Sequence, residues 1–346
     1  MTTKNSFVAR SPVPQLAKDN LHLVCGSGGS RAILASAGAI YALHKAGLDN
    51  WKTIGGISGG SLPSLLLASG EKPGDMVRLA IDIDFSSMLT RRTNVFMTFM
   101  AFLLKERLAQ SRPRKAVLGS EKLRDFLDGR ITEWPEKYWT MAVAGRTQIV
   151  FTAKGVFQYL HDGTMRQLSD KPAPLGDAVR ASCAIPGIIE PVLWTNPRNG
   201  EGIYLFDGAL SWDGQCPIGV VVRDFGAKPN EVVGCDVGDR HFGGFSGFVS
   251  KFWRFFCGQG CVWPDDETDP AFWAAQGSLV VYPELNKFNS LQFTLTAEQK
   301  WDAVIESYFA TVVRLWKIGR IDNAKFQELS ELARNPQLFK LDCANG

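Results

Sequence analysis

The sequence lacks an apolar run long enough to cross a membrane, and it lacks a strong excess of charge. A membrane-spanning helix needs about 18 consecutive apolar residues, and the longest apolar run, residues 95–104, is about half that length. The formal net charge is +3 and the isoelectric point is near 8.4, which is too mild to indicate a nucleic-acid partner. The sequence therefore predicts neither a transmembrane segment nor nucleic-acid binding.

Signals for export and for metal binding are also missing. Residues 1–20 are polar and lack the apolar core of a signal peptide, so we expect a flexible N-terminal arm and a cytoplasmic protein. The odd number of cysteines, seven, favours reduced thiols over a disulfide framework. Cys257 and Cys261 lack zinc-site spacing, and the acidic turn at residues 265–269 lacks EF-hand spacing. We expect no metal and no cofactor.

A dinucleotide-binding fingerprint is incomplete in the first glycine-rich loop. Residues 21–25 predict a buried strand, residues 26–31 a loop, and residues 32–46 an Ala/Leu-rich helix. Arg31 stands where the third glycine of G-x-G-x-x-G belongs, and residues 52–57 supply no acidic partner. The remaining interpretations are a plain turn, or backbone N–H groups at a helix start that bind a phosphate or an oxyanion.

A second glycine-rich turn has a serine at its centre. Residues 51–57 predict a strand and residues 62–68 a helix, with Gly56-Ile57-Ser58-Gly59-Gly60 at the junction. This order is typical of a nucleophile elbow, in which small neighbours let strand and helix approach while the hydroxyl enters a cleft. A right-handed crossover would bring both glycine loops to one edge of a parallel sheet. Ser58 is thus a candidate nucleophile, and a tight structural turn is the alternative.

Three of the four histidines are poor candidates for the base that a serine nucleophile needs. His22 falls within the first predicted strand and His44 on the first predicted helix, so we expect structural roles for both. His161 falls in a predicted hairpin turn.

The base is therefore either His241 or an acid. His241 follows a predicted strand at residues 231–237 and would complete the order Ser58, Asp207, His241, which α/β-hydrolases use. The alternative is that Asp207 itself accepts the proton from Ser58.

Four segments in register resemble the patatin-like phospholipase family. They are Gly28-Gly29-Ser30-Arg31, Gly56-Ile57-Ser58-Gly59-Gly60, residues 181–186 followed by residues 190–192, and Phe206-Asp207-Gly208-Ala209. Residues 280–285, followed by a predicted long helix at residues 297–317, resemble the closing part of the same domain. The resemblance covers roughly residues 21–320 and implies a three-layer α/β fold with a mostly parallel central sheet flanked by helices.

The resemblance implies a lipid acyl hydrolase with a catalytic dyad, in which Ser58 attacks the ester and Asp207 is the base. A carboxylate with an ordinary pKa of about 4 is a weak base at neutral pH, so we expect burial to raise the pKa of Asp207. The alternative for Asp207 is a structural Asx turn. The supporting residues implied are an oxyanion hole at Gly28, Gly29, Ser30 and Arg31, elbow glycines Gly56 and Gly60, and Gly208, which lets the aspartate turn approach the nucleophile.

One part of the family pattern is altered. The family loop reads Gly-Gly-Gly-x-Arg/Lys-Gly, whereas Ser27 and Ala32 replace its first and last glycines here. Serine and alanine resist positive φ, and losing one oxyanion donor typically costs about a hundred- to a thousandfold in rate. A catalytically weak or inactive lipid-binding or regulatory protein is therefore the alternative function.

The predicted organisation is one catalytic domain with two access segments. We expect an arm at residues 1–20, the domain at residues 21–320 and a C-terminal tail at residues 321–346. Residues near 85–115 combine apolar and cationic side chains, which suits an interfacial helix or a core helix with a solvated basic end. Residues near 242–275 combine aromatics with glycines, which suits a lid, a satellite core or an interface. The expected partners are a lipid or acyl-ester substrate and a membrane surface.

Overall fold

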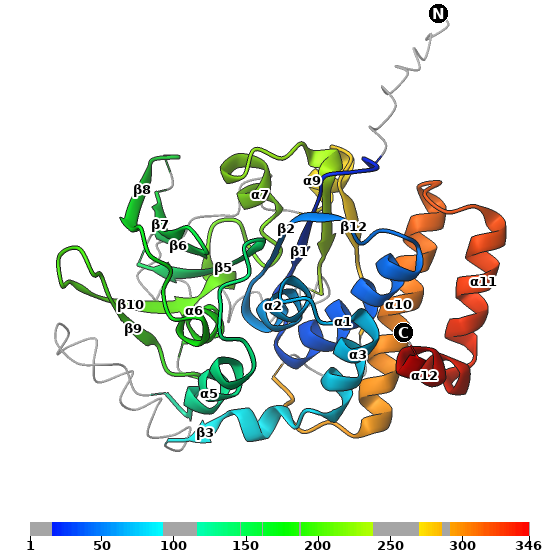
Figure 1. The fold of residues 1–346 in the computed structure, drawn as a ribbon, viewed down its shortest axis with the longest axis horizontal. Coiled ribbons are helices and arrows are strands. Elements are labelled where there is room, and N and C mark those ends of the chain that lie inside the picture. The colour runs from blue at the N-terminus through cyan, green and yellow to red at the C-terminus, as the bar shows by residue number, and fades with distance from the viewer. Residues whose placement is uncertain are drawn as a thin grey trace, which may run out of the picture.

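The computed structural model describes residues 16–92, 116–145, 147–160, 162–186, 188–237, 270–285 and 291–345. The predictions for most of the N-terminal arm, for His161 and His241, and for most of both access segments lie outside these residues. Within the described parts, a central sheet lies between helices on its two faces (Figure 1). Strand β1 shows this layering, because Leu21, Leu23 and Cys25 face one buried cluster while Val24 faces the other.

One half of the sheet is parallel and holds both glycine loops. Its strand order is β12, β11, β1, β2 and β5, and β1 lies between β11 and β2. All five residues of β1 are buried, as expected for a strand covered on both faces. The bounds are β1 Leu21–Cys25, β2 Trp51–Gly56, β5 Tyr138–Ala144, β11 Val232–Cys235 and β12 Leu279–Val281.

The other half of the sheet is antiparallel, so the sheet as a whole is mixed rather than mostly parallel. Beyond β5, strands β6, β7 and β8 follow as hairpins, and β10 pairs antiparallel with both β5 and β9. Short connections between successive strands permit only antiparallel pairing. The bounds are β6 Thr147–Thr152, β7 Gly155–Tyr159, β8 Met165–Ser169, β9 Val192–Thr195 and β10 Gly202–Asp207.

The helices carry apolar faces that cover the sheet. Helices α1, α2, α3 and α10 contribute to one buried cluster, and α7 and α9 contribute to the cluster on the opposite face. The bounds are α1 Gly29–Lys45, α2 Ser61–Ala68, α3 Pro73–Asp82, α5 Glu121–Arg130, α6 Leu175–Ser182, α7 Ile218–Asp224, α9 Pro270–Ala275, α10 Ala297–Lys317, α11 Asn323–Arg334 and α12 Pro336–Asn345. A two-residue ladder joins β3 Thr90–Arg91 to β4 Leu118–Gly119.

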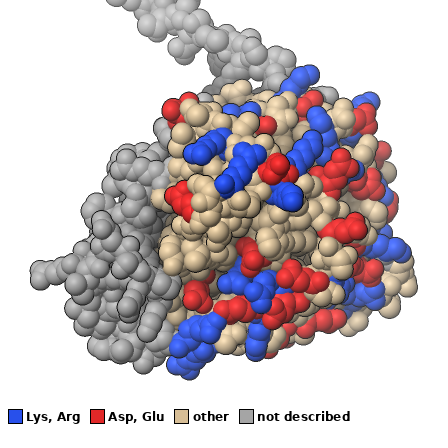
Figure 2. All heavy atoms as spheres, turned by 60° about the vertical axis from the view of Figure 1, so that its left-hand side comes forward, with Lys and Arg blue, Asp and Glu red and all other residues tan. Residues whose placement is uncertain are grey.

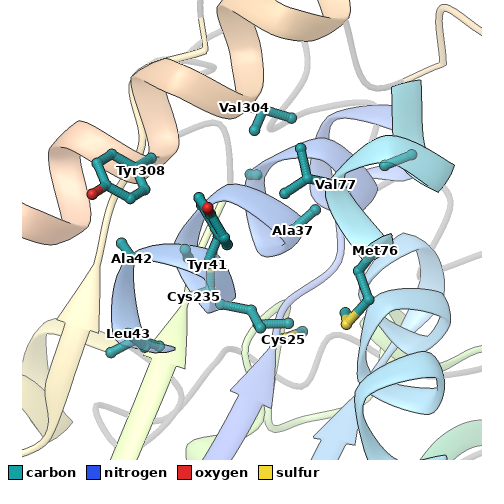
Figure 3. Close-up of a cluster of buried hydrophobic side chains, with 14 of the residues drawn as sticks. Cys25, Ala37, Tyr41, Ala42, Leu43, Met76, Val77, Cys235, Val304 and Tyr308 are labelled. Carbon is teal, nitrogen blue, oxygen red and sulfur yellow. The ribbon is translucent and has the colours of Figure 1, made fainter. Parts of the chain in front are cut away.

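Helix α1 is buried for most of its length and is held by its neighbours. Figure 3 shows Tyr41 of α1 between Tyr308 of α10 and the strands that carry Cys25 and Cys235. The backbones of α1 and α10 approach closely, since a Cβ on Gly38 would lie 2.3 Å from the carbonyl oxygen of Val304. The helix that starts at the first glycine loop therefore has a fixed position relative to the sheet.

Residues 321–346, expected as a C-terminal tail, contain two packed helices. Helix α12 lies against α1 and α3 (Figure 1), and Phe339 is fully buried among aromatic side chains. The Tyr41 hydroxyl donates a hydrogen bond to the Asp342 carboxylate, and Lys45 Nζ lies 2.9 Å from the same group. In the part of the chain that the structure covers, no helix combines the length and apolarity needed to cross a membrane.

Candidate active site

Ser58 occupies a strained turn directly after β2. Its φ is +51°, and among the described residues only Asn20 is another non-glycine residue with positive φ. Such a conformation costs about 1–3 kcal/mol and persists only where the surroundings enforce it. The side chain is 2% exposed, and a short 3-10 turn, Ser58–Gly60, leads into α2. The structure thus gives Ser58 the backbone strain expected of a nucleophile elbow.

The elbow and the first glycine loop are in direct contact, as the crossover argument predicts. A Cβ on Gly59 would lie 2.1 Å from the carbonyl oxygen of Gly29, and a Cβ on Gly60 would lie 2.4 Å from that of Gly26. Gly56 is similarly close to Gly60. Only glycine permits these approaches.

Three side chains fix the backbone of Ser58. Ser182 Oγ accepts a hydrogen bond from the Ser58 N–H at 3.0 Å. The Ser58 carbonyl oxygen accepts hydrogen bonds from Ser61 Oγ at 2.5 Å and from Cys183 Sγ at 3.2 Å. Sequence reasoning missed these roles, although Ser182 and Cys183 lie within the small-residue segment 181–186.

Asp207 ends β10 and is buried, as expected. It is 3% exposed, and its Oδ1 accepts a hydrogen bond from the Ala209 N–H at 2.8 Å, so the Asx turn considered above is present. Its other oxygen, Oδ2, is buried and makes no hydrogen bond of normal geometry with the residues described. Gly208 is needed at this turn because a Cβ there would lie 2.3 Å from the carbonyl oxygen of Met141. One carboxylate oxygen is thus committed to structure and the other is not.

Burial raises the pKa of Asp207 from its ordinary 3.8 to about 7. The Ala209 N–H and the Ser58 hydroxyl oppose this rise because both interact with the ionised carboxylate. The Asp207 turn also packs against the elbow, since a Cβ on Gly208 would lie 3.2 Å from Cγ2 of Ile57, the residue before Ser58. A carboxyl group with this pKa is about half ionised at neutral pH and is basic enough to take a proton.

The loop before α1 puts its positive φ angles on the two glycines it retains. Gly28 has φ +149° and Gly29 has φ +56°, whereas neither Ser27 nor Ala32 has positive φ. Ala32 is helical, and the Ser27 N–H donates to the Gln215 carbonyl at 2.7 Å. The two departures from the family pattern therefore fall where a side chain causes no backbone strain.

Helix α1 starts at Gly29, whereas the sequence predicted a start at residue 32. The difference arises because the glycine-rich residues before 32 are typical of a loop. Its first internal hydrogen bond runs from the Ala32 N–H to the Gly28 carbonyl, so the N–H groups of Gly28 and Gly29 precede the helical ladder. Ser30 and Arg31, in the first turn, are 1% and 4% exposed, so Arg31 is not a surface arginine. Ser30 Oγ donates to the Gln292 carbonyl at 2.8 Å.

An ion pair between a buried carboxylate and a partly exposed arginine holds the loop that follows Asp207. Asp213 is 3% exposed and receives hydrogen bonds from Arg223 at 2.8 Å and from Gln148 Nε2 at 2.5 Å. The same loop supplies the Gln215 carbonyl that binds Ser27. The ion pair therefore helps place the carboxylate strand and the glycine loop relative to each other, and no local sequence signal indicated it.

An apolar pocket opens beside Ser58. The empty space within it, open solvent at its mouth included, is about 670 Å³. Ser58, Gly29, Ser30 and Gly59 line one part of it. The rest is apolar apart from Cys183: Ile33, Leu62, Ile83, Phe85, Met88, Leu89, Leu123, Phe126, Val179, Ile185, Ile189 and Phe293. This lining suits a hydrocarbon chain rather than a sugar or a nucleotide.

Two histidines have structural surroundings, as expected. His22 Nδ1 lies 2.7 Å from Thr53 Oγ1, and burial lowers the pKa of His22 to about 4. His44 lies at the end of α1 and faces Asp49 at 3.3 Å. His161 and His241 lie outside the described residues.

Among the described residues on the face drawn in Figure 2, basic and acidic side chains are interspersed, in keeping with the small net charge.

Comparison with known proteins gives one family match. A family model described as patatin-like phospholipase matches residues 23–220, more than half of the chain. Among solved structures, the crystal structure of VipD from Legionella pneumophila is similar over 87% of this chain and 68% of its own, with 15% sequence identity and a TM-score of 0.43. No curated protein matches the chain.

Proposed function

Because the chain belongs to the patatin-like phospholipase family, we propose that it hydrolyses acyl esters of lipids with a Ser58–Asp207 dyad. The observation that supports this proposal is the buried Asp207, whose pKa is raised to about 7 by burial and whose turn packs against the elbow of the strained Ser58. The family supplies the reaction class, a hydrolase of the phospholipase type. The assignment of residues to steps is our inference.

In the proposed reaction, Ser58 Oγ attacks the ester carbonyl carbon while its proton passes to Asp207 Oδ2. The N–H groups of Gly28 and Gly29, with the first turn of α1 at Ser30 and Arg31, stabilise the oxyanion. Asp207 then returns the proton to the departing alcohol, which leaves an acyl group on Ser58. Water, deprotonated by Asp207, attacks this acyl-enzyme and releases the fatty acid, and the proton returns to Ser58.

The apolar pocket supports a lipid substrate. An acyl chain bonded to Ser58 can extend along the wall formed by Ile83, Phe85 and Met88, where it buries apolar surface. A membrane or micelle surface is the source of such substrates, so contact with a lipid surface is part of the proposal.

The proposal is tested first by a fluorophosphonate probe, which labels an activated serine hydroxyl. We expect labelling at Ser58, found by mass spectrometry of the peptide, together with release of p-nitrophenol from medium-chain esters. The Ser58→Ala variant should show neither. Absence of labelling in folded wild-type protein would instead favour the lipid-binding or regulatory alternative.

The pH dependence of hydrolysis should report the pKa of the Asp207 carboxyl group. Only the ionised form accepts a proton from Ser58, so kcat/KM should rise with pH and level off above an apparent pKa of about 7. Initial rates with a soluble ester across the neutral range measure this limb. An ascending limb near the ordinary carboxyl pKa would contradict a buried aspartate as the base.

A further inference from the structure

A buried lysine lies behind the wall of the pocket. Lys300, in the first turn of α10, is 6% exposed. Its ammonium group donates to the carbonyl oxygens of Ile81 at 2.7 Å and Ile83 at 2.5 Å. These carbonyls lie at the end of α3, where helical C=O groups lack intrahelical partners and carry partial negative charge. Lys300 therefore caps α3 from a different helix.

The segment that leaves this cap forms one wall of the pocket. Ile83 lines the pocket, and the following 3-10 turn, Phe85–Met88, adds Phe85 and Met88, with Leu89 next. Lys300 Nζ lies 5.0 Å from the centroid of the Phe85 ring, which is within range of a cation–π interaction. One ammonium group thus holds both the backbone at the start of the wall and its first aromatic side chain.

Lysine is a costly choice at this position. The first turn of a helix disfavours a positive charge, and burial of an ammonium group carries a desolvation penalty. Burial lowers the pKa of Lys300, and the nearby carboxylates of Asp84 and Asp82 raise it. The α3 carbonyls, the Phe85 ring and these two carboxylates together offset the cost.

The far end of the wall is attached through backbone and through an exposed side chain. Strand β3 pairs with β4, and the Arg92 N–H donates to the Val117 carbonyl at 2.8 Å. The Arg92 side chain pairs with Glu121 and, at 3.7 Å, with Glu190, but it is 48% exposed, and ion pairs in contact with water contribute little. Lys300 is therefore the buried charged attachment, and it acts at the near end of the wall, beside Ile83 and Phe85.

We propose that Lys300 is a positioning residue for acyl-chain selection, because it fixes the wall at residues 83–89 against the pocket. This inference rests on the proposed function, since it assigns the pocket to the acyl chain of the substrate. Lys300 touches no reacting atom and acts through Phe85 and the α3 cap. Loosening this attachment admits longer chains, because the wall can then move outward.

The test is the chain-length profile of Lys300→Met, which keeps the apolar stem and removes the charge. We expect the ratio of kcat/KM for the hexadecanoate over the butyrate p-nitrophenyl ester to rise by about tenfold. Phe85→Leu, which shortens the wall directly, should move the ratio in the same direction. The double variant should change it less than the sum of the two effects, because both act through one contact.

Lys45→Met is the matched control. Lys45 is also a partly buried lysine with a carboxylate partner and an aromatic ring, at 2.9 Å and 5.9 Å, but it lies on α1 away from the pocket. The Lys45→Met variant should leave the chain-length ratio unchanged even if its melting temperature falls. An unchanged profile in Lys300→Met or in Phe85→Leu, or an equal shift in Lys45→Met, overturns the inference.

A binding measurement separates this inference from the proposed function. Butyrate, octanoate, dodecanoate and hexadecanoate are used to displace a fluorescent fatty acid from Ser58→Ala, with and without Lys300→Met. A change in the order of displacement supports the role of Lys300 even if no ester is hydrolysed, in which case the hydrolase proposal alone fails. An unchanged order overturns the role of Lys300.

Discussion

Replacement of Asp207 by asparagine is expected to lower kcat for ester hydrolysis by about a thousandfold, with KM changed little. The amide keeps the shape of the side chain and can still accept the Ala209 N–H through Oδ1, but it cannot take the proton of Ser58. Steady-state kinetics with a medium-chain ester measure both parameters. His241→Ala is the companion variant, and it should retain activity close to wild type.

The stability of Asp207→Asn shows whether its loss of activity comes from the missing base or from unfolding. Burial raises the pKa of Asp207 to about 7, so the folded state binds this proton more tightly than the unfolded state. Wild-type stability therefore falls as the pH rises from the ordinary carboxyl pKa through about 7, and the loss is complete above that. Asp207→Asn lacks this penalty, so its melting temperature relative to wild type should increase from about pH 5 to about pH 8.

The opposite kinetic result would change the mechanism. An active Asp207→Asn together with an inactive His241→Ala would favour His241 as the base that activates Ser58. In that case the proposed roles of Ser58 and of the two glycine turns would stay the same, and only the base would be a different residue.

The second large effect is expected from Gly59→Ala. The added Cβ would lie 2.1 Å from the carbonyl oxygen of Gly29, so the elbow and the glycine loop must separate. We expect a loss of about 1–3 kcal/mol in the free energy of unfolding from this overpacking. Activity should fall by about a hundredfold or more, because the oxyanion donors shift relative to Ser58. Denaturant unfolding and kcat/KM measure the two losses.

Gly129→Ala is the control for this substitution. Gly129 lies in α5 with open space around its Cα, so an added methyl group meets nothing. Alanine favours a helix over glycine by about 1 kcal/mol, and this variant should therefore be as stable as wild type or more so, with full activity. Equal behaviour of the two variants would mean that the loop contact at Gly59 is unimportant.

The sequence predicts the parts of the fold that have strong local signals. Strand β1 has the predicted bounds because its apolar run is bordered by polar residues and glycines. Helix α10 also has its predicted bounds, and the reciprocal cap between Thr296 and Gln299 explains its sharp start. The start of α1 and the antiparallel half of the sheet differ from prediction, since glycine φ angles and strand partners are set by tertiary contacts.

The candidate site likewise contains some features that the sequence predicts and others that it does not. The two glycine turns are predictable, because each is a short motif whose place at the sheet edge follows from chain handedness. Asp207 is indicated by the family resemblance and not by handedness, since it ends an antiparallel strand. The groups that hold the site in place are not predictable: Ser182 reaches Ser58 across 124 positions, and Lys300 reaches Ile81 across 219. Such contacts depend on how distant elements pack and leave no periodic pattern. The catalytic roles of Ser58 and Asp207 stay predictions.

The anchoring of α1 has a thermodynamic consequence. The amides proposed to stabilise the oxyanion belong to a helix whose opposite end is tied through Tyr41 and Lys45 to Asp342 on α12. A displacement of α1 as a whole, which would carry these amides away from Ser58, must therefore break contacts between segments some three hundred residues apart in the chain.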